Sequence, residues 1–126
     1  MDRPDLNRVY QNLLIIPGAA KSGTSSLHHY LNQHPKISGS DPKEPHYFSY
    51  NERFNNELFK QIPYNQLFSN IEKTAFYLDS STSYLISNLA IKNIYSSNSN
   101  TKFIFLLRNP IDRIISHYNW LVGKRE

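Results

Sequence analysis

Apolar positions along the chain follow two alternating patterns. Continuous apolar runs at 13–16, 75–78 and 103–107 are bounded by polar or turn-forming residues, and the last run is the clearest. Such runs are typical of strands buried on both faces. After each run, apolar residues recur three and four positions apart, as on one face of a helix. Strands that alternate with helices predict an α/β fold, a parallel sheet flanked by helices.

The first helix is expected soon after residue 23. It ends at His34-Pro35, because proline forces the residue before it out of the helical conformation. Its apolar face consists of Leu27, Tyr30 and Leu31. Prolines predict a loop or a short extended piece over 37–48, and the segment 51–70 suggests one or two short helices broken at Pro63.

Two further helices follow the second and third strands. One is introduced by Ser83 and ends at the polar cluster 96–100. Its apolar stripe consists of Leu85, Ile86, Leu89, Ala90 and Ile94. The other follows Asn109-Pro110, an N-cap residue and then a proline suited to the first helical position. Its apolar face consists of Ile111, Ile114, Ile115, Tyr118, Leu121 and Val122.

The composition indicates a single small domain. The length of 126 residues, with 39% hydrophobic residues, suits one core, which we expect at 13–126 after a polar segment at 1–12. The charges in that segment exclude the apolar stretch of a secretory signal, and there is no cysteine for a disulfide framework or a thiolate metal site. We therefore expect a cytoplasmic protein. No apolar run reaches the roughly 20 residues that span a bilayer, so no membrane partner is expected.

The charge balance favours a small anionic ligand. The formal net charge is +4 and is spread along the chain. A nucleotide fits this balance, whereas a nucleic-acid partner does not, because the chain lacks a basic stripe with stacking aromatic residues.

The loop after the first strand, 17–26, is built from small residues around Lys21. Small side chains let backbone N–H groups approach an anion, and the following helix adds partial positive charge at its start. Taken alone, such a loop is more often a tight turn with an exposed lysine than an anion site. It differs from the Walker P-loop, in which lysine follows the second glycine, and Arg108 stands where a magnesium-binding carboxylate would be expected. Both differences argue against a kinase or another NTPase.

The segment 21–27, Lys-Ser-Gly-Thr-Ser-Ser-Leu, resembles the 5′-phosphosulfate loop of sulfotransferases that use 3′-phosphoadenosine 5′-phosphosulfate (PAPS). His34-Pro35 and the segment 43–48, Lys-Glu-Pro-His-Tyr-Phe, are similar to the heparan sulfate and bacterial members of that family. The resemblance implies a P-loop-like nucleotide-binding sulfotransferase fold over 13–126, with PAPS as co-substrate and no metal. The loop residues that would bind the phosphosulfate are Lys21, Ser22, Gly23, Thr24, Ser25 and Ser26.

Arg108 ends the third predicted strand, and Ser116 lies two helical turns later. Taken alone, Arg108 could equally pair with a carboxylate at the sheet edge, and Ser116 could simply face solvent. A guanidinium fork with a hydroxyl also suits a terminal phosphate. In the family that the chain resembles, this Arg-Asn-Pro pattern followed by serine is similar to the 3′-phosphate site. Arg113 is expected to form a surface ion pair.

Sulfuryl transfer needs positive charge near the departing phosphate oxygen and a base for the acceptor hydroxyl. Lys21 and the loop amides suit the first task. By resemblance to the heparan sulfate members, Glu44 is the predicted base, and His46 is the alternative because cytosolic members use a histidine. The acceptor group is expected to be a hydroxyl or an amine. Ser80 stands where those members often have a second lysine, so the acceptor stays open between a small molecule and a glycan. We expect Ser80 and Tyr84 to line the acceptor cleft.

Members of the family usually continue well beyond the last residue of this sequence. We therefore expect a fold that is incomplete at the C-terminus. The chain would be a fragment, a truncated gene product or half of a split enzyme, and in the last case a complementary C-terminal half is its expected partner. Two alternatives to an active sulfotransferase stay open. One is a module that binds PAPS or adenosine 3′,5′-bisphosphate without turnover, and the other is a divergent nucleotide kinase, which a magnesium requirement would reveal.

Overall fold

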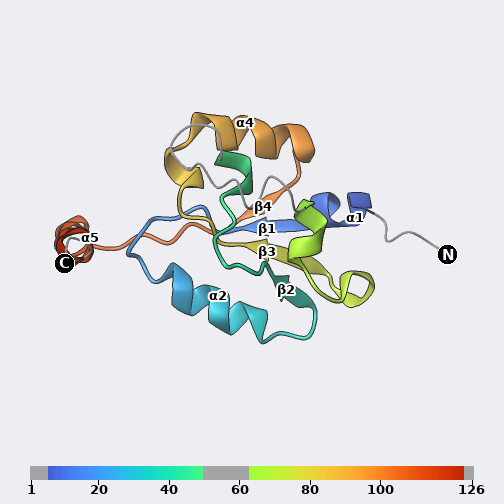
Figure 1. The fold of residues 1–126 in the computed structure, drawn as a ribbon, viewed down its shortest axis with the longest axis horizontal. Coiled ribbons are helices and arrows are strands. Elements are labelled where there is room, and N and C mark those ends of the chain that lie inside the picture. The colour runs from blue at the N-terminus through green and yellow to red at the C-terminus, as the bar shows by residue number, and fades with distance from the viewer. Residues whose placement is uncertain (1–5, 50–62, 124–126) are drawn as a thin grey trace.

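The computed structural model of the protein describes residues 6–49 and 63–123, arranged as a sheet between helices (Figure 1). The strands are β1 (Leu13–Ile15), β2 (Ile37–Gly39), β3 (Phe76–Asp79) and β4 (Lys102–Phe103). The α-helices are α1 (Leu6–Gln11), α2 (Thr24–Asn32), α4 (Asn88–Ser97) and α5 (Pro110–Gly123). Short 3₁₀ segments occupy Tyr47–Ser49, Tyr64–Leu67, Ile71–Lys73 and Tyr84–Ile86.

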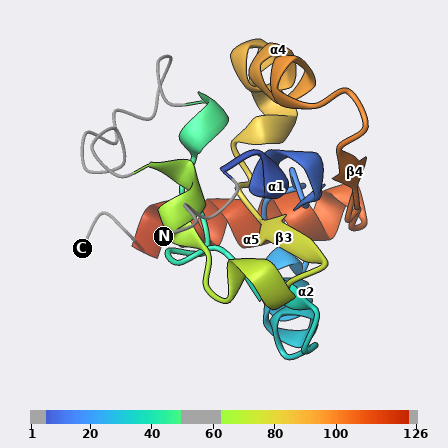
Figure 2. The ribbon, with the colours of Figure 1, turned by 90° about the vertical axis from the view of Figure 1, so that its right-hand side faces the viewer.

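The four described strands form one parallel sheet in the order β2-β3-β1-β4. β1 is central, since Leu14 pairs with Leu78 of β3 on one side and with Lys102 of β4 on the other. Helices α2 and α4 lie on opposite sides of the sheet, as Figures 1 and 2 show. The predicted α/β fold with a parallel sheet is therefore confirmed. Strand β2 falls in the segment that was expected to be a loop or a short extended piece.

The core has two parts because successive residues of a strand point to opposite faces of the sheet. Leu13 and Ile15 belong to a cluster that includes residues of α4. Leu14 and Ile16 belong to a second cluster, against which Leu27 and Leu31 of α2 pack. The run 13–16 is thus buried on both faces, as its unbroken apolar character predicts.

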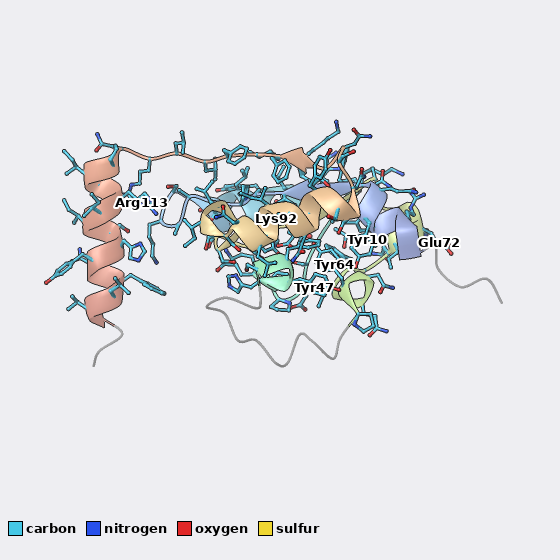
Figure 3. The ribbon with its side chains drawn as sticks, turned by 90° about the horizontal axis from the view of Figure 1, so that it is seen from above. Tyr10, Tyr47, Tyr64, Glu72, Lys92 and Arg113 are labelled. Carbon is cyan, nitrogen blue, oxygen red and sulfur yellow. The ribbon has the colours of Figure 1, made fainter. Side chains whose placement is uncertain are left out.

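Helix α1 lies within the segment that was expected to be merely polar. Val9 is fully buried, and the Arg8 guanidinium donates a 3.0 Å hydrogen bond to the carbonyl oxygen of Thr74. Tyr10 stacks on Tyr64 with ring centroids 5.6 Å apart, and both rings are labelled in Figure 3. The described part of this segment therefore contributes to the core.

Helix α2 begins after Gly23 and buries a histidine. Tyr30, predicted to lie on its apolar face, is 68% exposed, whereas His28 is buried. The His28 Nδ1 atom lies 2.6 Å from the Ser80 hydroxyl oxygen. Burial, together with the charge of Lys43, lowers the pKa of His28 to about 4, so the ring is neutral at neutral pH.

The helices after Ser83 and around Pro63 differ from those predicted. The helix expected to follow Ser83 starts four residues later, because Ser87 is its N-cap and accepts a 3.1 Å hydrogen bond from the backbone N–H of Ala90. Of the segment 51–70, residues 51–62 lie outside the described residues, and a single 3₁₀ segment follows Pro63.

A strand was predicted over 103–107 and expected to be buried, but the structure shows a shorter strand that is exposed. β4 comprises two exposed residues, and Leu107 beyond it is 82% exposed. The chain stays beside β1 and the loop after it, since the backbone N–H of Ile104 donates to the Ile15 carbonyl and that of Leu106 to the Gly18 carbonyl, both at 2.9 Å. β4 is exposed because it is an edge strand, and no described element covers its outer side.

Helix α5 is confirmed, and its predicted cap is present: Asn109 Oδ1 accepts a 3.0 Å hydrogen bond from the backbone N–H of Ile111. The helix stands beyond the carboxyl ends of the strands (Figure 1). Its apolar face is exposed, with Ile111 at 69% and Tyr118 at 64%. The helices of the described ranges are too short or too polar to cross a membrane.

Candidate active site

The loop between β1 and α2 has the backbone of an anion site. Lys21 and Gly23 both adopt positive φ, 62° and 87°. Left-handed residues in a loop turn backbone N–H groups toward one concave side, and a lysine in this region is uncommon. Helix α2 starts directly afterwards at Thr24, so its partial positive charge lies at the same place.

Ser22 adds a second sign of a ligand. Its hydroxyl oxygen is buried and has no hydrogen-bond partner. Among the described residues it is the one buried polar side-chain atom of which this is true. Buried hydroxyls are normally hydrogen-bonded, so an unpartnered one in this loop fits an oxygen atom of a bound anion.

The end of β4 and helix α5 converge on this loop. Arg108 donates a hydrogen bond from Nη1 to the Lys21 carbonyl at 3.2 Å. Arg113, which Figure 3 shows reaching from α5 toward the main body, donates from Nε to the Ala20 carbonyl at 2.9 Å. The Lys21 ammonium lies 4.6 Å from the ring centroid of Trp120. The loop after β1 and the guanidinium after β4 thus share one edge of the sheet, as predicted.

A cavity of about 710 Å³ opens beside the loop. It is lined by residues of the loop 20–26, of the segment 43–46 and of the turn 82–86, and by His117 and Trp120 of α5. The predicted site residues on its wall are Lys21, Gly23, Thr24, Ser25, Ser26, Glu44 and His46. Ser22, Arg108 and Ser116, all within the described ranges, lie outside this lining. The cavity therefore joins the predicted anion loop to both candidate bases.

Glu44 is held by Thr82, in the turn after β3. The backbone N–H and the hydroxyl of Thr82 donate to Glu44 Oε1 at 3.0 and 2.7 Å, while Lys43 Nζ lies 3.7 Å from Oε2. Burial raises the pKa of Glu44, but the Thr82 hydrogen bonds and the nearby charges of Lys43 and His46 together lower it below its ordinary value of 4.5. The carboxylate is therefore ionised at neutral pH and able to accept a proton.

His46 is held by the same turn. Its Nδ1 atom lies 2.6 Å from the Ser83 hydroxyl oxygen, and its backbone N–H donates to Ser81 Oγ at 3.0 Å. Burial lowers the pKa of His46 by more than the charges of Glu44 and Asp79 raise it. The imidazole is therefore neutral at neutral pH, and its backbone is fixed in the left-handed region at φ 52°.

A family model for the sulfotransferase domain matches residues 11–124. The chain belongs to the sulfotransferase family. Members of this family generally use PAPS as the sulfuryl donor. The sulfotransferase of Alicyclobacillus acidocaldarius has a similar structure, with a TM-score of 0.73 and 35% sequence identity over 91% of this chain and 51% of that protein.

Curated sulfotransferases match the same region. The membrane-associated sulfotransferase kil1 of Dictyostelium discoideum is 28% identical over 108 residues, which are 86% of this chain and 22% of that protein. The heparan sulfate glucosamine 3-O-sulfotransferase 3B1 of Mus musculus is 30% identical over 112 residues, 88% of this chain and 27% of that protein. The chain thus spans about a quarter of these curated relatives and about half of the solved structure.

The burial or the contacts of several side chains in the sulfotransferase domain differ from those predicted. Ser80 and Tyr84 were expected to line the acceptor cleft, but both are buried, Ser80 against His28 and Tyr84 in the core. Arg113 was expected in a surface ion pair and instead binds the loop carbonyl of Ala20. Ser116 is half-buried on α5.

Among the cavity residues, Thr82, Ser83, His117 and Trp120 were not predicted as residues of the site. The first two belong to a run of hydroxyl residues directly after a strand, a signal that was present in the sequence. The other two follow Arg113 at helical spacing, on the side of α5 away from the apolar face. That side turns toward the loop because Arg113 and Trp120 contact Ala20 and Lys21.

Proposed function

We propose that this domain provides the donor site and the base of an enzyme that transfers a sulfuryl group from PAPS to a hydroxyl acceptor. One observation carries the proposal: the lysine of an anion-binding loop and an ionised, half-buried glutamate line the same cavity at the carboxyl ends of parallel strands. Ligands of open parallel sheets bind at this edge. Family membership supplies the reaction class.

The proposed step is a displacement at sulfur. The acceptor oxygen forms a bond to sulfur while the bond between sulfur and the 5′-phosphate oxygen breaks, which releases adenosine 3′,5′-bisphosphate. The acceptor proton passes to Glu44, with His46 as the alternative base. Lys21, the loop N–H groups and the Ser22 hydroxyl stabilise the charge that grows on the departing phosphate, and this arrangement needs no metal.

Arg108 and Ser116 are proposed to bind the 3′-phosphate of the nucleotide. Two features support this role. Arg108 lies directly against the loop through its hydrogen bond to Lys21, and its planar fork suits phosphate oxygens. Ser116 lies on the side of α5 that also carries Arg113 and Trp120, since the three residues are three to four positions apart.

The acceptor is proposed to be a hydroxyl of a glycan or of a small molecule. Several relatives are named as sulfotransferases of heparan sulfate glucosamine, and this supports a glycan acceptor. A heparan oligosaccharide that contains glucosamine is therefore the first probe for turnover.

Titration with adenosine 3′,5′-bisphosphate tests the donor site. We expect saturable binding by calorimetry without added metal, together with a change in Trp120 fluorescence, because a phosphate that engages Lys21 draws its ammonium away from the indole ring. Trp120 is the only tryptophan in the sequence, so the signal has one source. Binding of ATP with magnesium, without binding of the bisphosphate, would contradict the proposal and support a nucleotide kinase. Bisphosphate binding without transfer to any acceptor would support the non-catalytic module.

We also propose that a complementary C-terminal half of the sulfotransferase fold covers the apolar face of α5. The exposure of this face and the 51% coverage of the solved relative support the proposal. A polypeptide equivalent to the second half of the Alicyclobacillus protein, co-expressed with this domain, should co-purify with it. Ile114→Glu should abolish the association because it places a charge in the apolar contact. Asn119→Glu, on the same helix outside the apolar face, is the control, and equal loss in both variants would contradict the proposal.

A further inference from the structure

A buried carboxylate fixes the turn that follows β3. Asp79, the last residue of β3, is fully buried. Its Oδ2 accepts hydrogen bonds from the hydroxyls of Tyr64 and Tyr84, both at 2.7 Å. Its Oδ1 accepts from the backbone N–H and the hydroxyl of Ser81 at 3.1 and 2.7 Å. Four donors from three residues thus leave the start of this turn little freedom, since each is buried and directional.

The fixed turn reaches across to the segment that carries the candidate bases. Ser81, held by Asp79, accepts the backbone N–H of His46. The next two residues each meet one base: Thr82 donates twice to Glu44, and Ser83 lies 2.6 Å from His46 Nδ1. Three consecutive hydroxyl residues, Ser81, Thr82 and Ser83, thus link the buried Asp79 carboxylate to the two bases.

We propose that Thr82 and Ser83 are positioning residues for sulfuryl transfer, which hold Glu44 and His46 at the cavity wall, and that Asp79 fixes the turn carrying them. This inference rests on the proposed function. It gives the two carboxylate oxygens of Glu44 different tasks: Oε1 receives both Thr82 donors, and Oε2 is the oxygen that takes the acceptor proton. Thr82 thereby orients the base without touching the reacting atoms.

A shape-matched pair of variants tests the role of Thr82. Thr82→Val removes the hydroxyl donor and keeps the volume, whereas Thr82→Ser keeps the donor. With PAPS and the heparan oligosaccharide as substrates, Thr82→Val should lower kcat by about tenfold or more, the effect of losing a hydrogen bond to a charged group. The affinity for adenosine 3′,5′-bisphosphate should stay unchanged, and Thr82→Ser should retain most of the wild-type kcat. Equal kcat in the valine and serine variants would overturn the proposal.

A second measurement does not depend on turnover. The carboxyl carbon of Glu44, followed by NMR during a pH titration, should titrate at higher pH in Thr82→Val than in the wild type and in Thr82→Ser. The charges of Lys43 and His46 influence the pKa of Glu44 in all three proteins, and Lys21 and His117 line the same cavity in all three. A difference in the Glu44 titration between the variants therefore reports the Thr82 hydroxyl alone. Coincident titrations of all three proteins would overturn the contact. If the wild type fails to bind the bisphosphate, the proposed function fails even where the Glu44 titration still shows the Thr82 contact.

Discussion

Replacing Lys21 with alanine is expected to weaken the binding of adenosine 3′,5′-bisphosphate by about 10- to 100-fold, because a charge-assisted contact to phosphate is lost. Turnover of PAPS should fall by more than affinity, since the ammonium also stabilises the charge that grows on the departing 5′-phosphate. Removing one such donor costs about 10²- to 10³-fold in kcat in other enzymes. Calorimetry and initial-rate kinetics measure the two effects separately.

Lys92→Ala is the matched control for this variant. Lys92 is exposed on α4, remote from α5 (Figure 3), and its removal changes the net charge of the protein by the same amount. Unchanged affinity in this control shows that the effect of Lys21 is local. Wild-type affinity in Lys21→Ala would contradict the assignment of the loop as the phosphosulfate site.

The parts of the fold that depend on near neighbours in the sequence were predictable. The run 13–16 became a central strand because four consecutive apolar residues satisfy both faces of a sheet. Asn109-Pro110 starts a helix because the Asn109 side chain accepts a free backbone N–H and proline needs none. Neither outcome requires knowledge of distant residues.

Burial depended on partners that a local pattern does not reveal. The run 103–107 is as apolar as a central strand, yet it occupies an edge, and α5 has an amphipathic pattern without a described partner for its apolar face. On α2, His28 is buried where Tyr30 was expected, because the Ser80 hydroxyl offers the ring a hydrogen-bond partner. Sequence spacing identifies a helix face, but the opposing surface decides which residue of that face is buried.

In the candidate site, too, some residues were predictable from the sequence, whereas those that depend on distant contacts were not. Resemblance to the family predicted Lys21, Glu44 and His46, and the structure brings all three to one cavity. The residues that hold the bases, Thr82 and Ser83, were missed because their importance comes from contacts with residues more than thirty positions away. A run of hydroxyl residues after a strand is compatible with many structures until its partners are known.

Glu44→Gln is expected to lower kcat for sulfuryl transfer by about 10²- to 10⁴-fold, the usual contribution of a positioned general base. The amide oxygen of glutamine can still accept the Thr82 hydrogen bonds, so the loop should keep its shape and the affinity for adenosine 3′,5′-bisphosphate should stay at the wild-type value. His46→Gln is the comparison, because a larger loss of kcat in that variant would make His46 the base. Undiminished turnover in Glu44→Gln would remove Glu44 from the mechanism.

The pH dependence of kcat gives an independent check on Glu44. A base acts in its ionised form, and the pKa of Glu44 is lowered below 4.5, so the wild-type rate should hold through neutral pH and fall only as the pH drops below 4.5. Loss of a Thr82 donor raises that pKa, and the acid limb of the profile should then move to higher pH in Thr82→Val. If the acid limb is unchanged in Thr82→Val but disappears in His46→Gln, the base is the His46 imidazole instead, because Ser83 rather than Thr82 contacts that ring.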